Sequence, residues 1–210
     1  MPAEPEPRGD SNATADGAYT ARLLRLEQAR WRRVLNVQAP YRWHIRHLGL
    51  GRTLDVGCGI GRNLSHLDGN GIGIDHNEES VAVARSRGLV AHTPADFLGS
   101  ADAVVKSFDS MLLAHVVEHM SLPEARELIR TYLPYVKAHG KVCLITPQEA
   151  GYRSDATHVQ FVDFAKLREL SDLLSLTIRE ESSFPLPRWA GRFFPHNEFV
   201  VVAELDAAAS

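Results

Sequence analysis

The chain has few cysteines, no long apolar run and no excess of basic residues. Two cysteines among 210 residues give no disulfide framework. No apolar run approaches the length of a membrane span. The first residues are acidic and rich in proline, whereas a signal peptide has a positive start followed by an apolar stretch. These absences predict a cytoplasmic protein with no membrane partner.

The net charge of −3 arises entirely in residues 1–16, which hold four acidic residues and one arginine. The rest of the chain has 22 basic and 22 acidic residues. A nucleic-acid-binding domain usually has a strong basic excess, so this balance argues against a nucleic-acid partner. Residues 22–46 are a local exception, with seven arginines opposed only by Glu27. That run is either a contact for phosphate or RNA, or a solvated helix face.

The order of apolar patterns predicts one α/β domain. Residues 1–16 have almost nothing to bury and are expected to be a disordered tail. Residues 17–210 are expected to form a single domain, with a cap of helices over 17–50 and a Rossmann-like core over 51–206. Alternating strands and helices there predict a doubly wound, mostly parallel sheet of seven strands. The strands are expected at 53–56, 72–75, 89–92, 108–114, 141–146, 175–182 and 197–205. A helix that starts at Ser121 is expected to stop at His139-Gly140.

A glycine-rich turn follows the first predicted strand, in the segment T-L-D-V-G-C-G-I-G at 53–61. Gly57, Gly59 and Gly61 allow a ligand to approach the backbone closely. Asp75 ends the next strand, where a carboxylate can accept hydrogen bonds from ribose hydroxyls. A dinucleotide fingerprint needs a glycine where Arg62 stands, so that class of cofactor is excluded. Asp55 instead suits a ligand with a positive amino group.

These motifs resemble those of the class I S-adenosylmethionine (SAM) methyltransferases, and the resemblance implies their fold and cofactor. It implies that Asp96 accepts from the adenine amino group and that Phe97 packs on the adenine ring. Without the family, Asp96 is equally well explained as a residue at a helix start. The cofactor-binding residues that the resemblance implies are Asp55, Gly57, Cys58, Gly59, Gly61, Asp75, His76, Asp96, Phe97 and Ala114.

The fourth predicted strand ends in A-H-V-V-E-H-M, residues 114–120. H-x-x-E-H is also an inverted zinc-protease pattern, but its place at the end of a parallel strand excludes that interpretation. The segment resembles the E-x-x-E-H motif of metal-dependent O-methyltransferases that act in ubiquinone biosynthesis or on small-RNA 3′ ends. The small-RNA group adds a histidine downstream of a T-P dipeptide, as His158 follows Thr146-Pro147 here. The resemblance thus implies a metal tetrad of His115, Glu118, His119 and His158.

His115 replaces a glutamate of that motif, which favours Mn²⁺ over Mg²⁺ because imidazole is the softer ligand. Two alternatives to the metal site remain open. His158 can act as a general base without a metal, with Glu118 and His119 beside it, or the histidines can be structural. In either catalytic case, Glu118, His119 and His158 are the candidate catalytic residues.

As a whole, residues 20–205 resemble the actinobacterial sugar O-methyltransferases, including enzymes that methylate the 1-hydroxyl of 3-O-methylated mannosides. This resemblance implies a SAM-dependent O-methyltransferase with a small saccharide as acceptor. An aromatic loop over 184–196 can stack on a sugar or a base, or it can form a lid or a homodimer contact. The alternatives are a ribose 2′-O-methyltransferase of RNA, a methyltransferase of quinols or phenols, and a non-catalytic SAM-binding scaffold.

Overall fold

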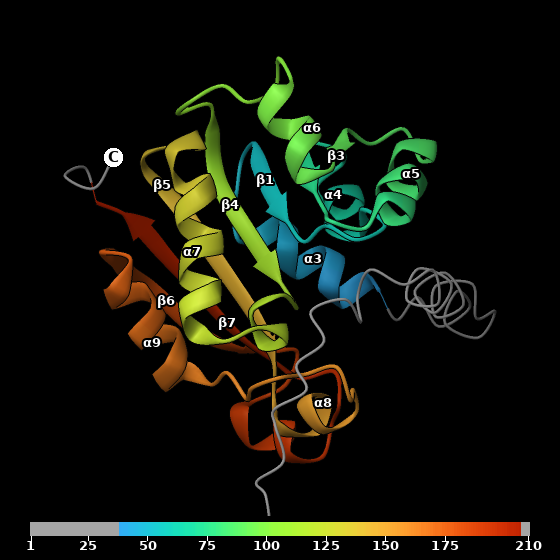
Figure 1. Cartoon of the computed structure of the whole chain (residues 1–210). Coiled ribbons are helices and arrows are strands. Elements are labelled where there is room, and N and C mark those ends of the chain that lie inside the picture. The colour runs from blue at the N-terminus through green and yellow to red at the C-terminus, as the bar shows by residue number, and fades with distance from the viewer. Residues whose placement is uncertain (1–37, 207–210) are drawn as a thin grey trace, which may run out of the picture.

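The computed structural model describes residues 38–206, which form a seven-stranded sheet with helices on both faces (Figure 1). The strand order is β3-β2-β1-β4-β5-β7-β6, and only β7 runs antiparallel to its neighbours. This is the predicted doubly wound α/β architecture. The strands are β1 Thr53–Val56, β2 Gly71–Ile74, β3 Ala91–His92, β4 Phe108–Ala114, β5 Val136–Pro147, β6 Leu176–Phe184 and β7 Glu198–Leu205.

Two sets of helices cover the two faces of this sheet. The main apolar cluster joins the inner sides of α7 and α9 to β1, β4, β5 and β7, and a second cluster joins α3 to the other side of β4, β5 and β7. The α-helices are α3 Ala39–His47, α4 Arg62–His66, α5 Glu78–Ser86, α6 Pro94–Gly99, α7 Leu122–Tyr132, α8 Glu149–Arg153 and α9 Phe164–Leu173. Three 3₁₀-helices are η1 Val117–His119, η2 Leu133–Tyr135 and η3 Arg188–Arg192.

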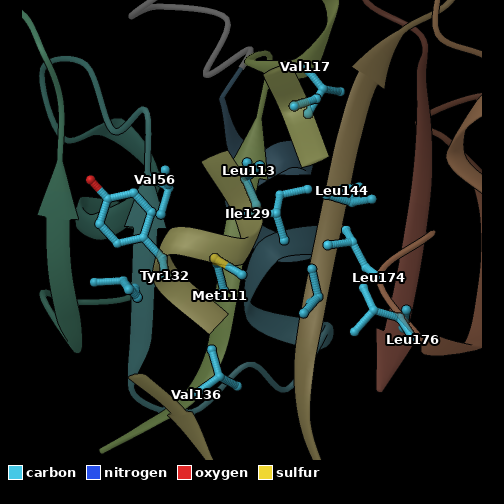
Figure 2. Close-up of a cluster of buried hydrophobic side chains, with 14 of the residues drawn as sticks. Val56, Met111, Leu113, Val117, Ile129, Tyr132, Val136, Leu144, Leu174 and Leu176 are labelled. Atoms are coloured by element: carbon cyan, nitrogen blue, oxygen red, sulfur yellow. The ribbon is translucent and has the colours of Figure 1, made fainter. Parts of the chain in front are cut away.

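The central strand β4 shows why the sheet needs cover on both sides. Met111 and Leu113 pack into the main cluster with Ile129 of α7, as Figure 2 shows. Leu112 points the other way and packs with Ile45 of α3. All three strand residues are fully buried. A parallel strand with both faces covered is apolar at successive positions, and this is the F-D-S-M-L-L-A pattern of the sequence.

The end of α7 differs from the sequence prediction. The helix begins as predicted, with the Ser121–Glu124 capping box, but it ends at Tyr132 rather than at His139-Gly140. Pro134 explains the early stop, because it has no N–H and cannot donate the next hydrogen bond of the α-helix. The chain then enters β5 at Val136, so the fifth strand is longer than predicted.

Some predictions concern residues outside the described range. The disordered tail at 1–16 and the first part of the helical cap expected over 17–50 both lie there, as does most of the arginine-rich run. The described part of that cap contains α3. Within residues 38–206, no helix combines the length and the apolar composition that crossing a bilayer would require.

Candidate functional site

The glycine turn after β1 has the backbone conformation that its sequence predicts. Gly57, Gly59 and Gly61 have φ angles of 79°, 52° and 78°, in the left-handed region that favours glycine. A Cβ atom on Gly57 would lie 2.4 Å from Cγ2 of Val116. The amide of Gly57 donates to the carbonyl of Ile74 at 2.7 Å, which joins the turn to the end of β2. The turn therefore presents bare backbone at the carboxyl ends of β1 and β2.

Asp75 stabilises this turn from the end of β2. One oxygen of its carboxylate accepts from the amide of Gly59 at 2.7 Å, and the other accepts from the amide of Asn77 at 2.9 Å. A carboxylate has about four lone-pair sites, so each oxygen can accept a further hydrogen bond. The structure thus brings Asp75 to the glycine turn, and its contact with ribose hydroxyls stays a prediction.

Asp55 is a fully buried carboxylate without a partner in the described part of the chain. Neither of its side-chain oxygens has a hydrogen bond from residues 38–206. Burial, helped by the negative charge of Asp75, raises the pKa of Asp55 to about 7. An unpaired buried carboxylate is costly, and a cationic group bound beside it would remove that cost. The amino group of SAM is such a cation, and its contact with Asp55 stays a prediction.

A cavity of about 320 Å³ opens beside the turn. It is lined by the glycine turn, the start of α4, the end of β4, α3 and residues 195–198. Of the predicted cofactor residues, Gly57, Cys58, Gly59 and Ala114 line it. Burial raises the pKa of the Cys58 thiol, so this cysteine contributes a neutral side chain to the wall.

The other six predicted cofactor residues do not line this cavity: Asp55, Gly61, Asp75, His76, Asp96 and Phe97. His76 is half exposed, with Nδ1 3.8 Å from the carboxylate of Asp75. Asp96 lies in the first turn of α6 and forms an ion pair with Arg85 at 3.5 Å. Phe97 is fully buried, and its ring centroid lies 5.0 Å from that of Tyr135. The contacts of Asp96 and Phe97 with adenine, and that of His76 with the cofactor, therefore stay predictions.

Three of the four predicted metal ligands come together. Ligand atoms of Glu118, His119 and His158 all lie within 4.8 Å of one another. Glu118 and His119 are in η1, whereas His158 is in the loop after α8. The amides of Val159 and Gln160 donate to the carbonyl of Glu118 at 2.8 and 3.2 Å, and these bonds bring the loop to η1. We refer to Glu118, His119 and His158 as the histidine cluster.

Hydrogen bonds orient both imidazoles of the histidine cluster. Nδ1 of His119 lies 3.1 Å from the carbonyl of Thr157, and Nδ1 of His158 lies 2.7 Å from that of Tyr152. Each ring must donate Nδ1–H to its carbonyl, so Nε2 carries the lone pair. Burial lowers the pKa of His119, which keeps this ring neutral. Both rings are thus prepared to bind a cation through Nε2.

Glu118 supplies the negative charge of the histidine cluster. The side chain is fully buried, and neither oxygen accepts a hydrogen bond within residues 38–206. Nδ1 of His115 lies 3.3 Å from Oε1 as an ion pair. Two oriented imidazoles and one buried carboxylate are a donor set that suits a divalent transition metal. The residues present therefore fit such an ion.

His115, the fourth predicted metal ligand, is not among the residues whose ligand atoms come together. Its φ is 60°, and its ring bridges Glu118 to Glu198, with Nε2 2.9 Å from Oε1 of Glu198. The ring is 45% exposed, and its partial desolvation, which would lower the pKa, is outweighed by the two glutamates, which raise the pKa of His115 to about 10. A protonated imidazole has no lone pair for a metal. In this arrangement His115 is a link between two carboxylates.

Several residues of the cavity wall had no signal in the sequence. Tyr41 and His44 of α3 and Glu198 of β7 line the cavity, although no motif marks them. In the aromatic loop, by contrast, Trp189 and Phe193 are 69% and 80% exposed and do not line it. The loop's stacking role for a sugar or base stays a prediction.

Comparisons with known proteins agree with this fold. A family described as "Methyltransferase domain" matches residues 54–144, from β1 into β5. A comparison with curated protein sequences gave no match. Among solved structures, a putative methyltransferase from Haloferax volcanii, in complex with its Trm112 activator, has a TM-score of 0.65 at 17% identity over 90% of this chain and 95% of its own.

Two further solved structures share the fold. Magnesium protoporphyrin IX methyltransferase from Synechocystis PCC 6803, with bound SAH, has a TM-score of 0.62 at 15% identity, over 92% of this chain and 97% of its own. A SAM-dependent methyltransferase from Archaeoglobus fulgidus has a TM-score of 0.58 at 18% identity, over 78% and 92%. The fold is that of the class I methyltransferases. The family match and the glycine turn support a SAM-dependent methyltransferase.

Proposed function

We propose that this protein transfers the methyl group of SAM to a hydroxyl oxygen of a small saccharide, with a divalent metal bound by the histidine cluster. The observation that carries the proposal is the buried carboxylate of Glu118 facing the oriented imidazoles of His119 and His158. A bound divalent metal would lower the pKa of an acceptor hydroxyl. That chemistry is what O-methylation needs, because an alcohol is a poor nucleophile near neutral pH.

The residues around the cavity have separate tasks in this proposal. Methyl transfer breaks one C–S bond and forms one C–O bond, and the acceptor hydroxyl loses a proton. Asp55 neutralises the amino group of the cofactor, and Asp75 holds its ribose. Gly57 lets the ligand lie against bare backbone. Most of the protein's contribution is thus orientation of the two reactants.

In an alternative mechanism without a metal, His158 would accept the proton of the acceptor hydroxyl. Its Nδ1 is engaged with the carbonyl of Tyr152, so Nε2 is the atom that would accept the proton. Chelation distinguishes the two mechanisms. With the metal, a strong chelator stops turnover, added Mn²⁺ or Mg²⁺ restores it, and the affinity for SAH measured by calorimetry stays the same. Full turnover in excess chelator would exclude the metal and leave His158 as the base.

A saccharide acceptor is supported by the resemblance to sugar O-methyltransferases and by the charge balance. The sequence beyond residue 16 is formally neutral, whereas binding to a polyanion depends on many basic residues. The cavity wall offers Tyr41, His44 and Glu198, which are hydrogen-bonding groups suited to hydroxyls. We expect transfer of labelled methyl groups to short mannosides, among them 3-O-methylated ones, at the 1-hydroxyl.

The second candidate is ribose 2′-O-methylation of RNA, because the small-RNA enzymes share the pattern of Glu118, His119 and His158. Salt dependence separates the two acceptors. Methylation of a neutral saccharide should change little between low and physiological salt, whereas an RNA acceptor should lose affinity steeply. Labelling of a small RNA, with none of short glycans, would overturn the saccharide proposal.

A further inference from the structure

Apart from the glycine turn, the cavity has a polar wall formed by α3 and the start of β7, and the histidine cluster does not line this cavity. Tyr41 and His44 come from α3, and His196 and Glu198 come from the chain that enters β7. Ile45 and Ile145 add apolar surface to the same cavity. This part of the cavity therefore combines a few polar groups with the apolar surface of the two isoleucines.

His44 carries the strongest sign of a missing ligand on this wall. The side chain is buried, with 9% of the residue exposed, and its Nε2 has no hydrogen-bond partner among residues 38–206. Its ring stacks on Phe184, with the centroids 4.0 Å apart and the planes at 6°. Stacking fixes the ring, so Nε2 is held in place without an internal partner. A buried polar atom of this kind is costly unless a bound group satisfies it.

Glu198 supplies a hydrogen-bond acceptor on the same wall. Its Oε1 accepts from Nε2 of His115 at 2.9 Å, and a carboxylate has lone pairs for further donors. Burial lowers the pKa of His44, and the nearby charge of Glu198 opposes this only in part. The imidazole of His44 is thus neutral, with one donor and one acceptor nitrogen. Together, His44 and Glu198 suit hydroxyl groups, because a hydroxyl can donate to one partner and accept from another.

Tyr41 fixes the shape of the wall. Its hydroxyl donates to the carbonyl of His196 at 2.7 Å, which ties α3 to the segment before β7. Its ring meets Phe184 edge-on, with the centroids 5.5 Å apart. Tyr41 and His44 therefore rest on the same phenylalanine, and the wall is already formed without a ligand.

We propose that His44 and Glu198 form an acceptor subsite that binds a neutral vicinal diol of a saccharide. One hydroxyl donates to the Glu198 carboxylate, while its neighbour hydrogen-bonds to Nε2 of His44. The carboxylate of Glu198 disfavours phosphate and carboxylate groups, so the subsite selects an uncharged acceptor. His115 links Glu198 to Glu118, which places the diol one imidazole away from the histidine cluster. This inference rests on the proposed function and names the group that the acceptor must carry.

Two variants and one control on the same helix test the subsite. His44→Phe keeps a ring on Phe184 and removes both nitrogens, and Glu198→Gln keeps the shape and removes the charge. The probe is a short 3-O-methylated mannoside, with labelled SAM. For both variants we expect the KM of the probe to rise about tenfold or more, the effect of one lost hydrogen bond to a buried group. We expect kcat to fall less than KM rises and SAH affinity to stay within about twofold. His47→Phe, on the exposed side of α3, should match the wild type.

Deoxy analogues of the probe give a test that does not depend on a variant's folding. The first analogue lacks the hydroxyl that His44 would bind, and the wild type should bind it about as weakly as His44→Phe binds the intact probe. His44→Phe should bind this analogue no more weakly than the wild type does. An unchanged KM in both variants, with an active wild type, would overturn the subsite and leave the proposed function standing. A wild type that methylates none of the saccharides would overturn both.

Discussion

The glycine turn and the histidine cluster lie at the ends of the neighbouring strands β1 and β4, but they are built in different ways. The turn is held by contacts between residues close in sequence, such as Gly59 to Asp75. The cluster needs His158, which is separated from η1 in the sequence by α7, β5 and α8. The turn is therefore a local structure with a local sequence signature, whereas the cluster exists only in the folded sheet.

The two regions should also separate in their effects on the reaction. The turn holds groups that suit the cofactor, and the histidine cluster holds groups that suit activation of a hydroxyl. Substitutions in the turn should therefore change SAH affinity, and substitutions in the cluster should change turnover. A variant in either region that changed both quantities equally would contradict this division.

The largest effect is expected at Glu118. Glu118→Gln removes the only negative charge of the histidine cluster and preserves its size. Turnover should fall about 100-fold or more, because metal activation of the hydroxyl or its acid–base equivalent is lost. SAH affinity from calorimetry should stay within about twofold. Glu127→Gln, at an exposed position on α7, is the control. A weaker SAH complex with normal turnover would place Glu118 in the cofactor site instead.

A smaller effect is expected at Asp75. Asp75→Ala removes the acceptor for the Gly59 amide and the acceptor that we predict for the cofactor ribose. SAH binding should weaken by about 1.5–3 kcal/mol, the range for hydrogen bonds to a charged group, or about 10- to 150-fold. Calorimetric titration measures this loss, and Asp68→Ala, on an exposed carboxylate, serves as the control. Unchanged affinity would show that the ribose binds elsewhere.

Gly57→Ala tests the backbone of the turn. The residue has φ of 79°, which costs a non-glycine residue about 1–2 kcal/mol, and the new Cβ would clash with Val116. Gly88 has the same φ of 79°, but a Cβ there meets nothing within 4 Å. Gly57→Ala and Gly88→Ala should thus both lower the melting temperature, whereas only Gly57→Ala should weaken SAH binding. Val116→Ala in the Gly57→Ala background should relieve the clash and leave the backbone strain. Equal SAH affinity in the two single variants would contradict a close approach at Gly57.

The smallest effect is the pH dependence set by Asp55. Its pKa of about 7 in the folded chain lies above the ordinary value, so the native state holds a proton that the unfolded chain releases. The stability of the ligand-free protein should therefore fall as pH rises from about 4 to 7. SAH affinity should rise up to about tenfold between pH 6 and 8, as the carboxylate becomes charged. Asp55→Asn should flatten both profiles, which thermal melts and calorimetry would show. A pH-dependent affinity that survives Asp55→Asn would assign the titration to another group.

The sequence by itself determined the sheet and the glycine turn. Buried strands are marked by apolar runs, and the turn is marked by glycines whose left-handed φ excludes other residues. The end of α7 was predicted wrongly, because the apolar periodicity continues past Pro134 whereas the helical hydrogen bonds cannot. Both successes depend on neighbours in sequence, where steric rules act directly.

Only the tertiary structure decided which side chains meet. The family motif assigned His115, Glu118, His119 and His158 to one metal site, but the fold places the ring of His115 between Glu118 and Glu198. His44 and Glu198 carry no motif, yet one lies in α3 and the other begins β7 on the same cavity. Spacing along a chain sets a local periodicity, whereas contacts between distant segments depend on the order of the strands and on the burial of charge. The sequence thus determined the glycine turn, and the packing of α3, β4 and β7 decided which other side chains line the cavity beside it.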